Sequence, residues 1–91
     1  MPKIILFKDT HYQGAHIVLQ QAVPNLEDLN WNDTVSSLIV CSGTWSLYDD
    51  TDYKGKNYVV NENGGPSGDG LFPSYKDWGQ ANDKLSSLKP A

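Results

Sequence analysis

The sequence predicts an all-β protein, an antiparallel β-sandwich built from two Greek-key halves. Several short segments rich in valine, isoleucine, leucine and tyrosine are bounded by turn residues. No stretch of helical length carries the 3.6-residue apolar period of an amphipathic helix. The chain also repeats itself, since residues 3–41 resemble residues 44–89 in outline. We therefore expect one domain over residues 1–91, with Greek key 1 at about 3–41 and Greek key 2 at about 44–89.

The expected strands follow from short apolar runs and from alternation. Ile4–Phe7 is a compact apolar run, and Trp45–Tyr48 alternates as a half-buried strand does. In chain order the expected strands are Lys3–Lys8, Ala15–Gln20, Val35–Cys41, Thr44–Asp49, Lys56–Asn61 and Leu85–Lys89. Asn25–Leu29 and Ser74–Trp78 could each form one helical turn. The glycines and proline of Asn61–Gly70 indicate a loop.

The composition narrows the possible functions. The 91 residues allow one modest core, and the 38% hydrophobic content is typical of a folded chain. Eleven acidic against seven basic residues give a formal charge of −4, which disfavours nucleic acid and membrane partners and suits cations. No window approaches the run of about 18 apolar residues of a membrane helix, and the N-terminal run is too short for a signal peptide. We expect a cytoplasmic protein that is a monomer or a weak homodimer.

Cys41 is the single cysteine of the chain, so an intrachain disulfide cannot form. The absence of paired cysteines favours a reducing compartment. Cys41 follows an apolar run, and free cysteines are among the most buried residue types. We therefore expect a buried, unreactive thiol.

Two eight-residue units carry the internal repeat. Phe7–Gly14 and Tyr48–Gly55 lie 41 residues apart, and both read aromatic, four residues, aromatic, one residue, glycine. A glycine at this place can adopt a positive φ and let the chain fold back. The two aromatic rings of each unit can then pack together over the hairpin.

A polar hexapeptide follows each unit. Asn32-Asp-Thr-Val-Ser-Ser37 returns 50 residues later as Asn82-Asp-Lys-Leu-Ser-Ser87. Together with the aromatic-glycine units, these hexapeptides make the whole chain resemble a single-domain member of the βγ-crystallin superfamily. The resemblance implies a βγ-crystallin-like sandwich of two Greek keys in which the two hexapeptides form a site for two Ca²⁺ ions. Members that keep both hexapeptides usually bind calcium, whereas many vertebrate lens members have lost the pattern.

The resemblance also implies which oxygens would bind each ion. The first ion would take the Ser36 hydroxyl, the Thr34 and Lys8 carbonyls, and the Asp83 carboxylate. The second ion would take the Ser86 hydroxyl, the Lys84 and Asp49 carbonyls, and the Asp33 carboxylate. Each half thereby lends a carboxylate to the ion of the other half. Asn32 and Asn82 are expected to brace the loops by hydrogen bonds.

Calcium suits these residues chemically. It is a hard cation that takes six to eight oxygens from carboxylates, hydroxyls, carbonyls and water. The histidines and the cysteine lie apart in the sequence, so zinc or copper is a poor fit. With about one carboxylate for each ion, we expect dissociation constants of about 10⁻⁵ to 10⁻³ M. A structural, buffering or stress-associated role follows as the expected function.

Three other functions are compatible with parts of the sequence, namely an EF-hand, an enzyme and a recognition module. Asp50–Gly55 begins like an EF-hand loop, but Lys54 stands at its fifth position, Asn61 stands at its twelfth, and no flanking helices are expected. No catalytic constellation is recognisable, so we expect no enzyme. The sequence leaves one alternative function, a recognition module whose calcium shapes a surface for a protein or a carbohydrate. Its stacking residues would be Trp31, Trp45, Trp78 and Tyr75, although core or loop packing is expected for the tryptophans.

Overall fold

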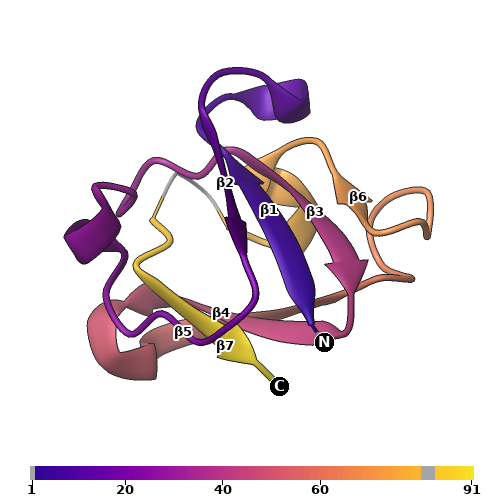
Figure 1. Cartoon of the computed structure of the whole chain (residues 1–91). Coiled ribbons are helices and arrows are strands. Elements are labelled where there is room, and N and C mark those ends of the chain that lie inside the picture. Colours follow the sequence, from indigo (N-terminus) through magenta and orange to yellow (C-terminus); the bar gives the residue numbers. More distant parts are fainter. Residues whose placement is uncertain (1, 81–83) are drawn as a thin grey trace.

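Two antiparallel β-sheets face each other in the computed structural model, which describes residues 2–80 and 84–91 (Figure 1). The first sheet has the strand order β2-β1-β3-β6 and the second has the order β5-β4-β7. The strands are β1 (Lys3–Phe7), β2 (His16–Leu19), β3 (Ser37–Ser42), β4 (Thr44–Asp50), β5 (Lys54–Asn61), β6 (Leu71–Phe72) and β7 (Ser87–Pro90). Four 3₁₀ turns join them: η1 (Thr10–Tyr12), η2 (Leu26–Leu29), η3 (Thr51–Tyr53) and η4 (Tyr75–Trp78). The predicted all-β Greek-key sandwich is confirmed.

The two halves of the chain exchange segments between the sheets. β6 belongs to the second half, yet it pairs with β3 of the first half through Leu38 opposite Phe72. In the reverse direction, Val23 of the first half forms an isolated bridge with Leu88 of β7. Each sheet is thus completed by a short segment from the other half.

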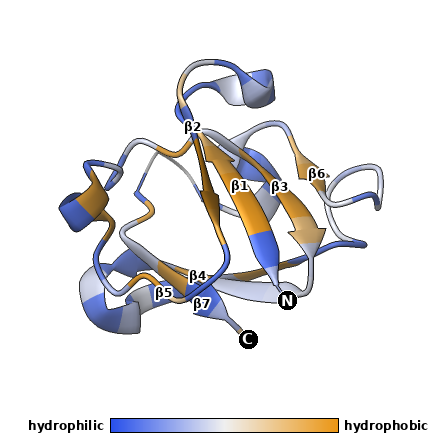
Figure 2. Cartoon of the chain, in the orientation of Figure 1, coloured by the Kyte–Doolittle hydropathy of each residue, from blue (hydrophilic) through white to orange (hydrophobic). Residues whose placement is uncertain are grey.

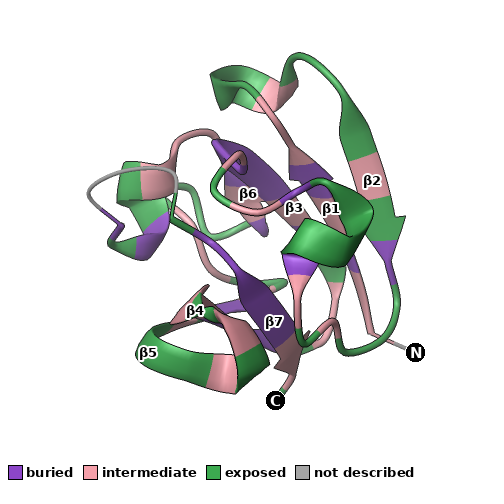
Figure 3. Ribbon diagram, turned by 90° about the vertical axis from the view of Figure 1, so that its left-hand side faces the viewer, coloured by how far each residue is buried: buried purple, intermediate pink, exposed green. Residues whose placement is uncertain are grey.

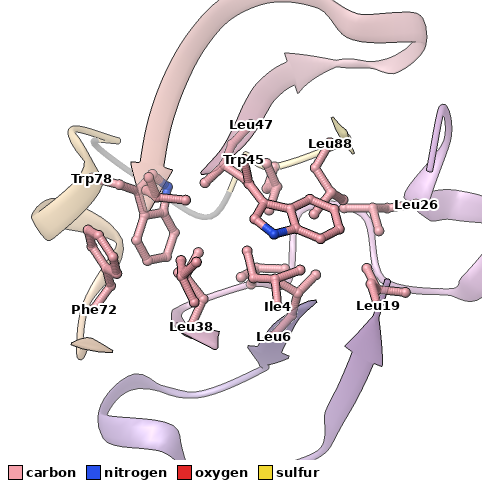
Figure 4. Close-up of a cluster of buried hydrophobic side chains, with 14 of the residues drawn as sticks. Ile4, Leu6, Leu19, Leu26, Leu38, Trp45, Leu47, Phe72, Trp78 and Leu88 are labelled. Carbon is pink, nitrogen blue, oxygen red and sulfur yellow. The ribbon is translucent and has the colours of Figure 1, made fainter. Parts of the chain in front are cut away.

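The core lies between the facing sides of the two sheets. Alternation along β1 turns Ile4 and Leu6 inward, and alternation along β4 does the same for Trp45 and Leu47 (Figure 4). Hydrophobic residues concentrate in the strands, while most connecting loops are hydrophilic (Figure 2). β2 and β5 lie at sheet edges and are largely exposed (Figure 3). This arrangement accounts for the alternating pattern of the sequence.

The structure corrects several details of the sequence-based expectations. The six expected strands are present, with ends that differ by at most two residues, but β6 within the second half was missed. The helical turns at Asn25–Leu29 and Ser74–Trp78 are confirmed as η2 and η4. The prediction of a buried Cys41 is wrong, because the residue is exposed. Val40 points into the core, so the period-two alternation of β3 turns Cys41 outward.

No described helical segment is long and apolar enough to span a membrane.

Candidate metal centre

A folded hairpin follows the first strand of each half. In the first half His11 and Tyr12 have positive φ values of 57° and 63°, and in the second half Asp52 and Tyr53 have 57° and 60°. These left-handed conformations are uncommon for residues other than glycine. The repeated backbone path shows that the aromatic-glycine units of the sequence encode the same tight turn twice.

Aromatic rings cover each hairpin, as the sequence predicts. The ring centroids of Phe7 and Tyr12 lie 5.6 Å apart with an edge-to-face geometry. Those of Tyr48 and Tyr53 lie 5.8 Å apart in the same geometry. Edge-to-face pairs of this kind are favourable beyond the area that they bury. The packing therefore helps to hold the strained turns.

The last serine of each hexapeptide ties its hairpin to the sheet. The Ser37 hydroxyl donates to the Asp9 carbonyl at 2.6 Å and accepts from the Tyr12 N–H at 3.0 Å. The Ser87 hydroxyl makes the equivalent bonds in the second half, to the Asp50 carbonyl at 2.6 Å and from the Tyr53 N–H at 3.0 Å. Neither serine belongs to the ligand sets that the resemblance implies. Their conservation between the two copies of the hexapeptide was the available signal.

The preceding serine brings each hexapeptide to the strand that leads into the hairpin. The Ser36 N–H donates to the Phe7 carbonyl at 2.9 Å, and the Ser86 N–H donates to the Tyr48 carbonyl at 2.9 Å. Lys8 and Asp49 are the next residues along these strands. The predicted hydroxyl and carbonyl ligands of each ion therefore come from segments that are in direct contact.

The hexapeptide of the first half also reaches the second half. The Asp33 N–H donates to the Leu85 carbonyl at 3.0 Å, directly before Ser86. Asp33 is exposed and has a positive φ of 54°, so its carboxylate is free of the core. The second ligand set that the resemblance implies also combines Asp33 with Ser86. The reciprocal residue, Asp83, lies outside the described residues.

Asp49 lies at an irregularity in β4. The pairing with β5 places Tyr48 opposite Asn57 and Asp50 opposite Lys54, and the register shifts between them. A residue at such a bulge does not belong to the regular ladder. The Asp49 carbonyl, a predicted ligand, therefore stands where the sheet pairing is interrupted.

The Asp49 carboxylate is held by two neighbours. It accepts hydrogen bonds from the Gln80 side-chain amide at 2.7 Å and from the Tyr58 hydroxyl at 3.2 Å. Desolvation, the Asp49 charge and the hydrogen bond to Asp49 together raise the pKa of Tyr58 above its usual value. The phenol therefore stays protonated and keeps donating at neutral pH.

The remaining predicted residues lie close to these segments. The Lys84 carbonyl accepts a long hydrogen bond of 3.4 Å from the Ser86 hydroxyl. The Thr34 hydroxyl donates to the Trp31 carbonyl at 2.9 Å, which closes the loop before Ser36. Within residues 2–80 and 84–91, no three histidine, cysteine, aspartate or glutamate side chains gather as a metal cluster. A cation at these loops would depend mainly on carbonyl and hydroxyl oxygens, which suits calcium better than zinc or copper.

Comparison with known proteins shows the family to which this fold belongs. The Beta/Gamma crystallin family model matches residues 3–91. The chain belongs to the βγ-crystallin family. As a βγ-crystallin, it is 39% identical over 89 residues to Beta/gamma-crystallin of Ciona intestinalis, and the match covers 98% of each chain.

Solved βγ-crystallin structures share the fold of this chain. The structure of a beta gamma crystallin from Ciona intestinalis matches with a TM-score of 0.87, covering 98% of this chain and 99% of the other. A betagamma-crystallin from an archaeon matches with a TM-score of 0.84 at 26% identity, covering 99% of this chain and 98% of that one. Mouse Gamma-crystallin D is 32% identical over 87 residues, and this match covers 96% of this chain. The match covers only 46% of the mouse protein. Relatives thus include single-domain proteins and longer chains.

The positions of the aromatic residues bear on the recognition-module alternative. Trp31 and Trp78 are each only 7% exposed, and Trp45 is fully buried. Tyr75 packs against the core cluster. The expectation of core or loop packing for the tryptophans is confirmed. This βγ-crystallin domain offers little exposed tryptophan surface on which a sugar ring could stack.

Proposed function

We propose that this βγ-crystallin domain binds two calcium ions and is stabilised by them. Each ion would lie where a hexapeptide meets the hairpin of its own half and the hexapeptide of the other half. The observation that carries the proposal is the hydrogen bond from the Asp33 N–H to the Leu85 carbonyl. It supports the placement of an aspartate of one half beside Ser86, the hydroxyl ligand of the other half.

The chemistry of the donors supports calcium. Ser86, Lys84, Asp49 and Asp33 offer one hydroxyl, two backbone carbonyls and one carboxylate, and water would complete six to eight oxygens. The net charge of −4 attracts divalent cations toward the domain. With so few carboxylates we expect dissociation constants of about 10⁻⁵ to 10⁻³ M. Such sites respond to high calcium concentrations.

Calcium would act on this domain through folding stability. The ions bind loops that both halves supply, and the unfolded chain cannot present them together. At a concentration 100 times the dissociation constant, each independent site adds about 2.7 kcal/mol to the free energy of unfolding. That is a large share of the 5–15 kcal/mol typical of a domain. We infer a structural, buffering or stress-associated role in the cytoplasm rather than catalysis.

Thermal unfolding tests the proposal. The midpoint of chelator-treated protein should rise by about 10 °C or more in saturating calcium, because one kcal/mol shifts a domain of this size by about 4–8 °C. Asp33→Ala combined with Asp83→Ala should abolish the rise. Asp28→Asn combined with Glu62→Gln removes two exposed acidic charges outside the proposed ligand sets and serves as the control. A calcium shift that survived in the Asp33/Asp83 variant would contradict the ligand assignment.

A further inference from the structure

The two halves carry opposite charges at one pair of equivalent positions. Lys8 of the first half corresponds to Asp49 of the second, since each follows the aromatic residue whose carbonyl accepts the N–H of a hexapeptide serine. The hairpins and their serine anchors are otherwise closely matched. A positively charged side chain, Lys8, therefore lies beside the first proposed ion, and a negatively charged one, Asp49, lies beside the second.

A second pair of equivalent positions also carries different residue types in the two halves. Trp31 and Gln80 each follow a 3₁₀ turn and one residue with a left-handed φ, which is 59° at Asn30 and 99° at Gly79. The N–H groups of Trp31 and Gln80 each donate to the carbonyl of the first residue of that turn, at 2.9 and 3.2 Å. Trp31 and Gln80 therefore occupy equivalent places in the two halves.

These exchanged residues contact each other within each half. The Lys8 ammonium lies 5.1 Å from the centroid of the Trp31 ring, which is a favourable cation–π distance. The Asp49 carboxylate instead accepts the hydrogen bond of 2.7 Å from Gln80. Each charge thus has a partner that suits it. The two halves therefore differ by a pair of residues in contact, Lys8 with Trp31 in the first half and Asp49 with Gln80 in the second.

Gln80 is an unusual residue to bury. It is only 2% exposed, and its Oε1 atom is buried without a hydrogen-bond partner among the described residues. An unpaired buried acceptor is destabilising, whereas a hydrogen bond from an amide to a carboxylate is stronger than a neutral one. The contact that offsets this cost is the one to Asp49. We therefore regard Gln80 as a residue that positions the Asp49 carboxylate.

We propose that Asp49 makes the second ion position the stronger of the two, and that this position fills first. The inference rests on the proposed function. Because the Ser86 N–H binds the residue next to Asp49, the Asp49 carboxylate lies within roughly 10 Å of Ser86. This separation is close to the Debye length of about 8 Å at physiological salt, so the charge is only partly screened from a bound divalent ion. Lys8 opposes binding at the first position in the same way, so each charge changes the local affinity about three- to tenfold.

The test follows each position separately in the full chain. Chelator-stripped ¹⁵N-labelled protein is titrated with calcium chloride, while the amide signals of Ser36 and Ser86 report the first and the second position. The Ser86 signal should reach saturation at lower calcium than the Ser36 signal. Asp49→Asn should weaken binding at the Ser86 position about three- to tenfold, and Lys8→Met should strengthen binding at the Ser36 position by a similar factor. Glu62→Gln removes one exposed acidic charge from the loop after β5 and should change neither order nor affinity.

Gln80 is tested by its coupling to Asp49. Gln80→Leu should weaken the Ser86 position in the presence of Asp49 and have little effect in the Asp49→Asn background, because the two residues would act through one contact. A purely structural effect of Gln80→Leu would weaken binding equally in both backgrounds and would overturn this role. If Gln80→Leu does not fold, the Asp49→Asn and Lys8→Met titrations still decide the inference.

The outcomes separate this inference from the proposed function. The inference would be overturned if two ions bind but the Ser36 and Ser86 signals saturate together, or if Asp49→Asn and Lys8→Met do not change the order of saturation. Either result would leave calcium binding itself intact. A chain that binds no calcium would overturn both.

Discussion

At the scale of single residues, the last serines of the two hexapeptides have the clearest structural role. The side chains of Ser37 and Ser87 are fully buried, and each joins a hairpin carbonyl and a hairpin N–H by short hydrogen bonds. Neither role could be read from the sequence, since Ser37 lies 28 residues from Asp9 and Ser87 lies 37 residues from Asp50. A repeated pair of serines indicates that a position matters without showing what the hydroxyl contacts.

Replacing Ser87 by alanine tests this role. The substitution leaves the Asp50 carbonyl and the Tyr53 N–H without their partner, and we expect a loss of about 1–3 kcal/mol in the free energy of unfolding. Chemical denaturation of calcium-free protein measures the loss, with Ser67→Ala in the exposed loop after β5 as the control. Equal stabilities of the Ser87 and Ser67 variants would contradict the assigned role.

The ionisation of Tyr58 gives a second prediction at this scale. Burial and Asp49 raise the Tyr58 pKa in the folded state above its usual value of 10.0. Tyr58 therefore contributes stability that is fully present below pH 10 and is lost as pH rises through the raised pKa. Asp49→Asn should lower the Tyr58 pKa toward 10, as measured by phenolate absorbance with Tyr58→Phe used to assign the signal. An unchanged Tyr58 pKa in Asp49→Asn would show that the hydrogen bond between them is absent.

At the scale of elements, the sequence predicted the long strands and missed the shortest one. Alternation and turn residues indicated β1 to β5 and β7, because each holds several residues of one pattern. β6 contains only Leu71 and Phe72, and its place in the sheet depends on pairing with β3 of the other half. Two residues cannot establish a period, so no local pattern could have revealed it. The same limit explains Cys41, whose outward direction depends on the register of β3.

Gly70 allows the loop before β6 to reach β3. Its φ is 80°, and an added Cβ would lie 2.6 Å from the Val40 carbonyl oxygen and 3.0 Å from the Glu62 carbonyl oxygen. We expect Gly70→Ala to destabilise the fold by about 2–4 kcal/mol, because backbone atoms would have to move. Gly68→Ala is the matched control, since its φ is 69° but its nearest contact would be at 3.6 Å. We expect that control to cost about 1 kcal/mol, and equal losses in thermal unfolding would refute the clash.

At the scale of the whole molecule, the candidate site depends on the association of the two halves. The internal repeat of the sequence indicated two similar halves, and the resemblance to βγ-crystallins implied that their loops exchange carboxylates. In the structure the Asp33 N–H donates to the Leu85 carbonyl, so the backbone of the first hexapeptide lies against the second one. The contrast between Lys8 and Asp49 was visible in the sequence only as a change of residue type. Its contacts with Trp31 and Gln80 required the fold.

Calorimetric titration of chelator-stripped protein with calcium tests the central proposal most directly. We expect two ions per chain, dissociation constants of about 10⁻⁵ to 10⁻³ M, and loss of binding in the variant that combines Asp33→Ala with Asp83→Ala. A titration without binding heat or any rise in thermal midpoint at millimolar calcium would contradict the proposal that these loops form a calcium centre.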